Sequence, residues 1–149
     1  MLNSLKIAAT AALLCFLPAL AGELDPNMVA FKLPEQLNWR GAAGGTQQAV
    51  IFGDPNKEGS LYGIVIKWAP HTGSRPHSHP NDRFIYVISG TWWKGTGAKY
   101  DADSMVPMKA GSVITDIGKG IHYDGARDEP VVLEIVGIGP ATTTNAEQK

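Results

Sequence analysis

The sequence predicts a single all-β domain, and three observations carry this prediction. From about residue 48 onward, short apolar runs of strand length alternate with clusters of Gly, Pro, Asn and Asp, which are typical turn residues. No apolar repeat with the helical period of 3.6 residues lasts for three turns. The 149 residues, 44% of them hydrophobic and 18% charged, also suit one domain with its own core. We therefore expect a jelly roll or small closed barrel over residues 48–140.

Residues 1–21 have the features of a cleavable export signal. Lys6 precedes an apolar stretch, 7–20, that is shorter than the roughly 20 residues a membrane-spanning helix needs. Ala19-Leu20-Ala21 then supplies the small residues that a signal peptidase requires. We expect cleavage after Ala21, a periplasmic or secreted mature protein and no stable membrane span.

Polar segments flank the expected barrel on both sides. Residues 22–47 are interrupted by Pro26 and Pro34, and we expect them to form an N-terminal arm that packs on the barrel. Residues 141–149 contain no apolar run, so they are expected to be a flexible tail.

Eight apolar runs are expected to be strands because each is short and is bounded by turn residues. They cover residues 49–52, 61–69, 83–89, 91–94, 105–109, 112–116, 121–123 and 131–138. Eight strands in about 100 residues are typical of a jelly roll or a small barrel.

Charge and cysteine content exclude several function classes. With 13 basic and 14 acidic side chains the chain offers no cationic surface for nucleic acid, so a nucleic-acid partner is not expected. The single cysteine, Cys15, excludes an intrachain disulfide and a thiolate zinc cluster. A metal site would therefore need histidine and carboxylate ligands.

The four histidines all lie between residues 71 and 122. His77 and His79 alternate, so on a strand both would project from the same face and could chelate one ion. His122 lies at the start of a later strand and could supply a third imidazole. Asp124 would share the face of His122 and could orient it, whereas His71 is expected in a loop.

The spacing around these histidines resembles the cupin superfamily, in particular small single-domain cupins with an RmlC-like jelly roll. The first motif of that family has a glycine, His-x-His, a glutamate and an apolar strand that ends in glycine. The matching residues here are Gly73, His77, His79, the strand 84–88 and Gly90, and residues 111–122 match the second motif, which ends in its histidine. The resemblance covers residues 48–139. It implies a double-stranded β-helix barrel, a metal on His77, His79 and His122, and pairing of two copies into a homodimer.

One departure from the family concerns the chemistry, because Arg83 stands where the glutamate ligand is expected. A guanidinium stays protonated and has no lone pair to offer a metal. Three accounts are open. In the first, three histidines hold the metal, while Arg83 binds a substrate carboxylate or pairs with Asp82. In the second, Asp82 supplies the missing ligand, and in the third the barrel binds an organic ligand without a metal.

The predicted function depends on which account holds. With a divalent ion, Fe, Mn, Cu or Zn, the barrel would be a metalloenzyme with dioxygenase-like or related chemistry on a small oxygenated, anionic molecule. Arg83 and Tyr86 are then the candidate catalytic side chains. A periplasmic domain that binds or senses a small molecule or metal without catalysis is an alternative. A metal-free isomerase or lyase that uses acid–base chemistry is another.

Overall fold

The structure is a computed structural model that describes residues 22–148, and the expected signal peptide, residues 1–21, lies outside this range. The chain divides into two units, of which the first ends at Phe31 and the second begins at Lys32. In the first unit, the carbonyl of Asp25 accepts hydrogen bonds from the amides of Met28 and Val29, which forms a turn. The described residues contain no α-helix. Among them there is also no helix of any kind that is long and apolar enough to cross a membrane.

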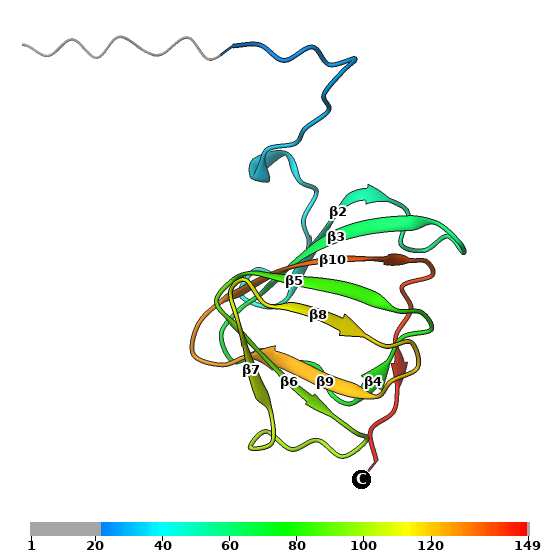
Figure 1. Cartoon of the computed structure of the whole chain (residues 1–149). Helices are drawn as coiled ribbons and strands as arrows, with labels where there is room; N and C mark the ends of the chain where they lie inside the picture. Colours follow the sequence, from blue (N-terminus) through cyan, green and yellow to red (C-terminus); the bar gives the residue numbers. More distant parts are fainter. Residues whose placement is uncertain (1–21, 149) are drawn as a thin grey trace, which may run out of the picture. The chain divides into compact units, whose positions relative to one another are not determined.

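The second unit consists of two antiparallel sheets and one short 3₁₀ helix, η1 (Pro34–Gln36). The larger sheet has the order β1 (Arg40–Gly41), β2 (Gln47–Gly53), β3 (Leu61–Trp68), β10 (Val131–Ile138), β5 (Arg83–Ser89) and β8 (Val113–Asp116). The smaller has the order β11 (Thr144–Asn145), β4 (His77–Ser78), β9 (His122–Ala126), β6 (Thr91–Thr96) and β7 (Val106–Lys109). In Figure 1 the strands of the larger sheet follow one another from β2 to β8, and β9, β6 and β4 lie on the other side of β8.

Alternation along the strands builds the core between the sheets. On β5, Ile85 and Val87 are buried, whereas Phe84 and Tyr86 between them are exposed, as a strand with one buried face requires. β10 follows the same period, whereas on β3 the four consecutive residues 62–65 are all buried. The core consists of Tyr62, Ile64, Ile85, Val87, Trp92, Ala126, Val131, Leu133 and Ile135.

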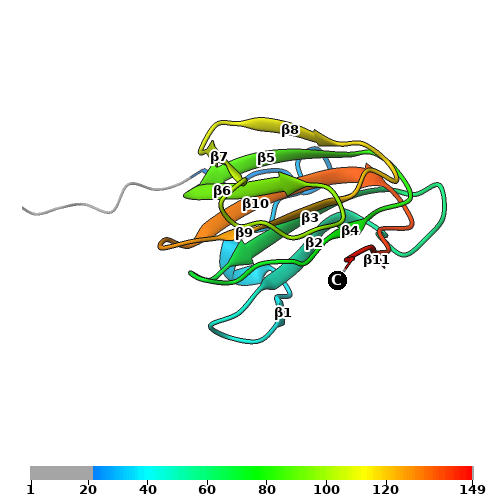
Figure 2. The same cartoon turned by 90° about the horizontal axis from the view of Figure 1, so that it is seen from below.

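The all-β prediction is confirmed, and each of the eight predicted runs coincides with a strand to within a few residues. Three short strands, β1, β4 and β11, have no apolar run and were not predicted. The tail expected to be flexible contains β11, which pairs with β4 so that Asn145 lies opposite His77. Figure 2 shows β11 beside β4. This segment is held by backbone hydrogen bonds, for which the polar sequence carries no signal.

Candidate metal centre

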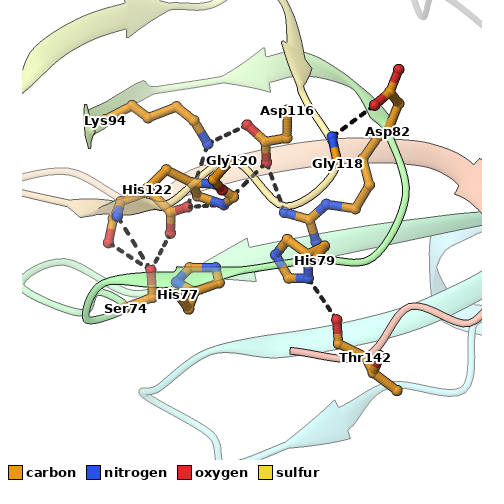
Figure 3. Close-up of polar contacts among 12 residues, drawn as sticks. Ser74, His77, His79, Asp82, Lys94, Asp116, Gly118, Gly120, His122 and Thr142 are labelled. Atoms are coloured by element: carbon orange, nitrogen blue, oxygen red, sulfur yellow. Dashed lines mark hydrogen bonds and ion pairs between the residues drawn. The ribbon is translucent and has the colours of Figure 1, made fainter. Parts of the chain in front are cut away.

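Three histidines from two neighbouring strands meet inside the barrel (Figure 3). His77 lies on β4 and His79 directly follows it, while His122 begins β9 opposite His77. The centroid of the His77 ring lies 4.9 Å from that of His79 and 4.5 Å from that of His122. All three residues are buried, with exposed fractions of 4–8%. One ring nitrogen from each lies within 4.8 Å of the others, so the trio predicted from the sequence is brought together and can hold a metal.

Backbone carbonyls fix the orientation of all three rings. Nδ1 of His77 lies 2.7 Å from the carbonyl oxygen of Arg75, Nδ1 of His79 lies 2.9 Å from that of Thr142, and Nδ1 of His122 lies 3.1 Å from that of Gly120. A carbonyl only accepts, so Nδ1 must donate, and in the neutral ring the lone pair is then on Nε2.

The free nitrogens of two of these rings are unusual for a protein interior. Among residues 22–148, Nε2 of His79 and Nε2 of His122 are buried and have no hydrogen-bond partner. A buried polar atom without a partner is costly, and here it is a metal-binding atom in the tautomer that ligation requires. The three histidines therefore fit a divalent ion, which would satisfy these nitrogens.

The surroundings keep two of the rings neutral. Burial lowers the pKa of His79 to about 4, and the charge of Arg83 acts in the same direction. Burial also lowers the pKa of His122 to about 4, with a further contribution from Lys94. Near neutral pH both rings therefore lack the proton that would compete with a metal.

The loop that follows His79 and the loop that precedes His122 are tied to each other. The carboxylate of Asp82 accepts a hydrogen bond of 2.7 Å from the amide of Gly118, and the carbonyl of His79 accepts one of 2.7 Å from the amide of Lys119. A Cβ at Gly118 would lie 2.9 Å from the carbonyl oxygen of Pro80, so this approach needs glycine. Asp82, the candidate ligand at position 82, thus holds the second loop and does not join the histidine cluster.

A buried group of four charges lies beside His122. Arg83 donates from Nη2 to Oδ2 of Asp116 at 2.8 Å, and these residues lie opposite each other on β5 and β8. Nζ of Lys94 lies 2.5 Å from Oδ1 of Asp116 and 3.7 Å from Oδ2 of Asp124. Arg83 therefore pairs with Asp116 and not with Asp82, and the two cations and two carboxylates cancel.

Asp116 is the most heavily contacted member of this group. Burial alone would raise the pKa of its carboxyl, but the charge of Lys94 and the hydrogen bond from Arg83 hold the pKa below its ordinary value. Its Oδ2 lies 3.3 Å from Nε2 of His122, whereas Oδ2 of Asp124 lies 3.9 Å from the same nitrogen. The expected place of Asp124 beside His122 agrees with this, and Ser74 holds Asp124 by a hydrogen bond of 2.7 Å.

Two other residues considered from the sequence lie apart from the histidines. Tyr86 lies on the outer face of β5 and is 46% exposed, because it alternates with the inward residues Arg83, Ile85 and Val87, and the structure does not bring it to the site. His71 has an exposed side chain near Asp128, in a loop as expected.

A cavity of about 550 Å³ opens onto His77, His79 and Arg83, a volume within the range of small-molecule sites. Its wall includes aliphatic side chains such as Ile64 and Ile135, and its polar lining includes Asn38, Arg40, Gln48, Asn56 and Asn145. Nε of Arg83 is buried and, among the described residues, has no hydrogen-bond partner. The guanidinium of Arg83 therefore lies at the wall of the cavity with one buried donor unpartnered.

Sequence reasoning did not single out Asp116, Lys94 or the carbonyl of Thr142. The one available signal was that Asp116 belongs to the segment 111–122, which resembles the second cupin motif. Placing Asp116 beside Arg83 needs the register of β8 against β5, and placing Lys94 beside Asp124 needs that of β6 against β9.

Comparison with known proteins gives structural neighbours only, since no family model and no curated protein matches the sequence. An RmlC-like cupin from Shewanella frigidimarina aligns with a TM-score of 0.58 and 14% identity over 73% of this chain and 90% of that one. The polyketide cyclase RemF from Streptomyces resistomycificus aligns with a TM-score of 0.65 and 12% identity over 82% of this chain and 88% of that one. The DMSP lyase DddQ from Ruegeria pomeroyi aligns with a TM-score of 0.58 and 13% identity over 76% of this chain and 64% of that one. These similarities confirm the predicted jelly-roll fold.

Proposed function

Because this chain has the cupin fold with three histidines turned inward, we propose that it is a metalloenzyme that acts on a small, oxygenated, anionic organic molecule. His77, His79 and His122 would hold a divalent ion, Fe, Mn, Cu or Zn. The observation that carries the proposal is the pair of buried, unpartnered Nε2 atoms on His79 and His122, each with its Nδ1 turned to a backbone carbonyl.

Charge around the site supports an anionic substrate. Arg83, Lys94, Asp116 and Asp124 cancel one another, and the histidines that hold an ion are neutral. The charge of a bound divalent ion would therefore remain to attract an anion from the cavity. A metal ion in such a site would polarise the oxygens of a substrate, and Arg83, which lines the cavity, would lie beside the bound molecule.

The structural neighbours indicate which reactions should be tested first. Their names include a polyketide cyclase and a DMSP lyase, which supports cyclisation or elimination on an oxygenated acid. Dioxygenase-type chemistry is tested in the same assays, by measuring oxygen uptake when the protein is mixed with the oxygenated acids used to test cyclisation and elimination.

Two further parts of the proposal concern location and assembly. Export with cleavage after Ala21 is supported by the pattern of residues 1–21 and is tested by N-terminal sequencing of the purified protein, which should begin at Gly22. A homodimer is supported by the exposed apolar side chains on β5, Phe84, Tyr86 and Ile88, and is tested by sedimentation.

The central test is metal content and metal uptake of protein purified without a histidine tag. We expect close to one Fe, Mn, Cu or Zn per chain, and its loss in His77→Ala and His122→Ala. His71→Ala is the matched control, because this fourth histidine is exposed and outside the cluster, and it should keep the metal. Absence of metal together with no uptake on titration would overturn the proposal.

A further inference from the structure

One cation on the wall of the cavity has no partner within residues 22–148. Three of the four arginines of the chain make an ion pair or a side-chain hydrogen bond in this range. They are Arg75 with Glu147, Arg83 with Asp116, and Arg127 with the carbonyl of Ala102. The fourth, Arg40, makes neither of these contacts in the same range, and it lines the cavity. Its guanidinium is therefore available to an anion.

The other charged lysine, arginine and carboxylate side chains of the lining are balanced. Arg83 and Asp124 belong to the buried group of four charges, which cancel one another. The charge of Arg75 is matched by that of Glu147. Among these side chains Arg40 is therefore the source of one uncompensated positive charge.

The register of the larger sheet turns Arg40 toward the cavity. Arg40 lies opposite Gln48, Gln48 lies opposite Ile66, and Ile66 lies opposite the core residue Leu133. Side chains directly opposite each other on paired strands project from the same face of a sheet. Arg40 therefore continues the inner face of the sheet at its edge, where β1 lies beside β2 (Figure 2).

Amide side chains accompany Arg40 along the polar part of the lining. Asn38, Gln48 and Asn56 are exposed, and their side-chain amides have no hydrogen-bond partner within the described part of the chain. Asn145 has such a partner only at Oδ1. An amide group both donates and accepts hydrogen bonds, as a hydroxyl group does. This lining therefore suits a molecule that carries hydroxyl groups.

We propose that Arg40 determines specificity by binding the carboxylate of a hydroxylated organic acid, while the neighbouring amides bind its hydroxyl groups. This inference rests on the proposed anionic substrate of the same cavity. A guanidinium offers two parallel N–H donors that match a carboxylate. A carboxylate carries one negative charge, like the single uncompensated charge of the lining, whereas a phosphate monoester carries about 1.5 to 2.

Arg40 and Arg83 would contact different parts of the bound acid. They lie on β1 and β5 of the same sheet, with β2, β3 and β10 between them. Arg83 is already paired with Asp116, so its charge is not free for a carboxylate. The sequence-based expectation that Arg83 binds a substrate carboxylate is thus replaced by a role for Arg40.

The test is calorimetric titration of metal-free protein with two acids and their uncharged counterparts. D-glucuronate and D-gluconate are compared with D-glucose and D-glucitol, which carry a CH₂OH group in place of the carboxylate. We expect the acids to bind at least about tenfold more tightly. Their affinity should also fall as NaCl is added, because salt screens an exposed charge. Equally tight binding of D-glucose 6-phosphate would overturn the assignment to a carboxylate.

Substitutions then locate the carboxylate. Arg40→Met should weaken both acids by about tenfold or more and remove the salt dependence, and Arg40→Lys, which keeps the charge without the fork, should lie between. Lys109→Met is the matched control, because this exposed cation on β7 lies outside the lining, and its affinity should stay within about twofold. Gln48→Leu should weaken the acids and keep the salt dependence, since the charge remains.

Two outcomes overturn the role of Arg40. One is acid binding that is equal in Arg40→Met and the original protein, which would place the carboxylate elsewhere. The other is the absence of acid binding to both metal-free and Co²⁺-loaded protein. Thermal unfolding of each variant shows whether it is folded.

Metal binding is measured separately, by competition between the protein and a chelator for Co²⁺, so that the two proposals fail in different ways. If the acids bind through Arg40 but the protein takes up no metal, the proposed metalloenzyme is overturned and the role of Arg40 stands. If Co²⁺ binds to the histidines but Arg40→Met does not affect acid binding, the metal site stands and the role of Arg40 is overturned.

Discussion

Arg83 and Asp116 lie opposite each other on β5 and β8 and form an ion pair of 2.8 Å inside the barrel. The cation that occupies the place of the expected glutamate is therefore matched by a carboxylate on the next strand. The pair brings the negative charge to within 3.3 Å of His122 without placing it at position 83.

Loss of one partner of this buried pair should destabilise the metal-free protein. We expect Asp116→Ala to reduce the free energy of unfolding by about 3–5 kcal/mol, since it leaves the guanidinium of Arg83 buried without its partner. The double substitution Arg83→Met with Asp116→Leu should recover most of this loss, because it removes both charges. Urea unfolding in the presence of a chelator measures both effects.

The control for this prediction is the ion pair of Arg75 and Glu147, whose Arg75 side chain is 58% exposed. Glu147→Gln should change the free energy of unfolding little, because solvent screens exposed pairs. Equal effects of Asp116→Ala and Glu147→Gln would contradict the assigned role of burial.

A carboxylate introduced at position 83 should lower the stability of the metal-free protein but raise its affinity for a metal ion. In Arg83→Glu the new side chain faces Asp116 across the two strands, so the metal-free protein should unfold at a lower temperature. Bound metal should be held more tightly than in the original protein, since a repelling cation is replaced by an anion, while activity on anionic substrates should be lost. Thermal unfolding with and without Co²⁺ checks the first two statements. Unchanged metal affinity would show that position 83 does not influence the ion.

The depressed pKa values of two histidines predict an acid-sensitive fold. His79 and His122 have a pKa of about 4 in the folded protein, against about 6.5 in an unfolded chain. Below pH 6.5 the unfolded state therefore binds more protons than the folded state, and stability should fall as the pH drops from 6.5 to 4. Above pH 6.5 these two groups should contribute no slope. Urea unfolding of metal-free protein at several pH values measures this.

A matched variant assigns the slope to the buried rings. His79→Gln should reduce the loss of stability between pH 6.5 and 4, whereas His71→Gln should leave the slope nearly unchanged, because the side chain of His71 is exposed. An equal slope in all three proteins would assign the pH dependence to other groups.

Much of the fold could be predicted because inward-facing and outward-facing side chains alternate along strands such as β5. On β5 the inward Ile85 and Val87 and the outward Phe84 and Tyr86 follow the period of a strand, so the sequence alone located this element. The same period placed Tyr86 outside, although it was considered as a candidate for the site. The outcome for Tyr86 shows that strand position, more than residue chemistry, decides which side chains reach the interior.

Contacts between strands distant in sequence could not be predicted in the same way. His77 and His79 share a face because they are two residues apart, whereas Asp116 reaches Arg83 only through the register of β8 on β5. The role of residues 141–148 was also hidden, since β11 is held by backbone groups that any residue carries.

The C-terminal segment should contribute to metal binding through its backbone. The carbonyl of Thr142 accepts from Nδ1 of His79, and the segment is fixed by the pairing of β11 with β4 and by the amide of Ala146, which donates to the carbonyl of Pro76. Removal of residues 141–149 should therefore leave His79 free to rotate. We expect Co²⁺ affinity to fall by about 10- to 100-fold, as for other partners that orient a ligand.

The control for this truncation is Glu147→Gln, which removes an exposed ion pair and leaves β11 and the carbonyl of Thr142 in place. It should bind Co²⁺ like the original protein in the same chelator competition. Circular dichroism should show that the truncated chain keeps its β structure, because the core residues lie on β3, β5, β6, β9 and β10. Unchanged Co²⁺ affinity in a folded truncated protein would mean that His79 is oriented by its own strand and loop, and that the carbonyl of Thr142 is not needed.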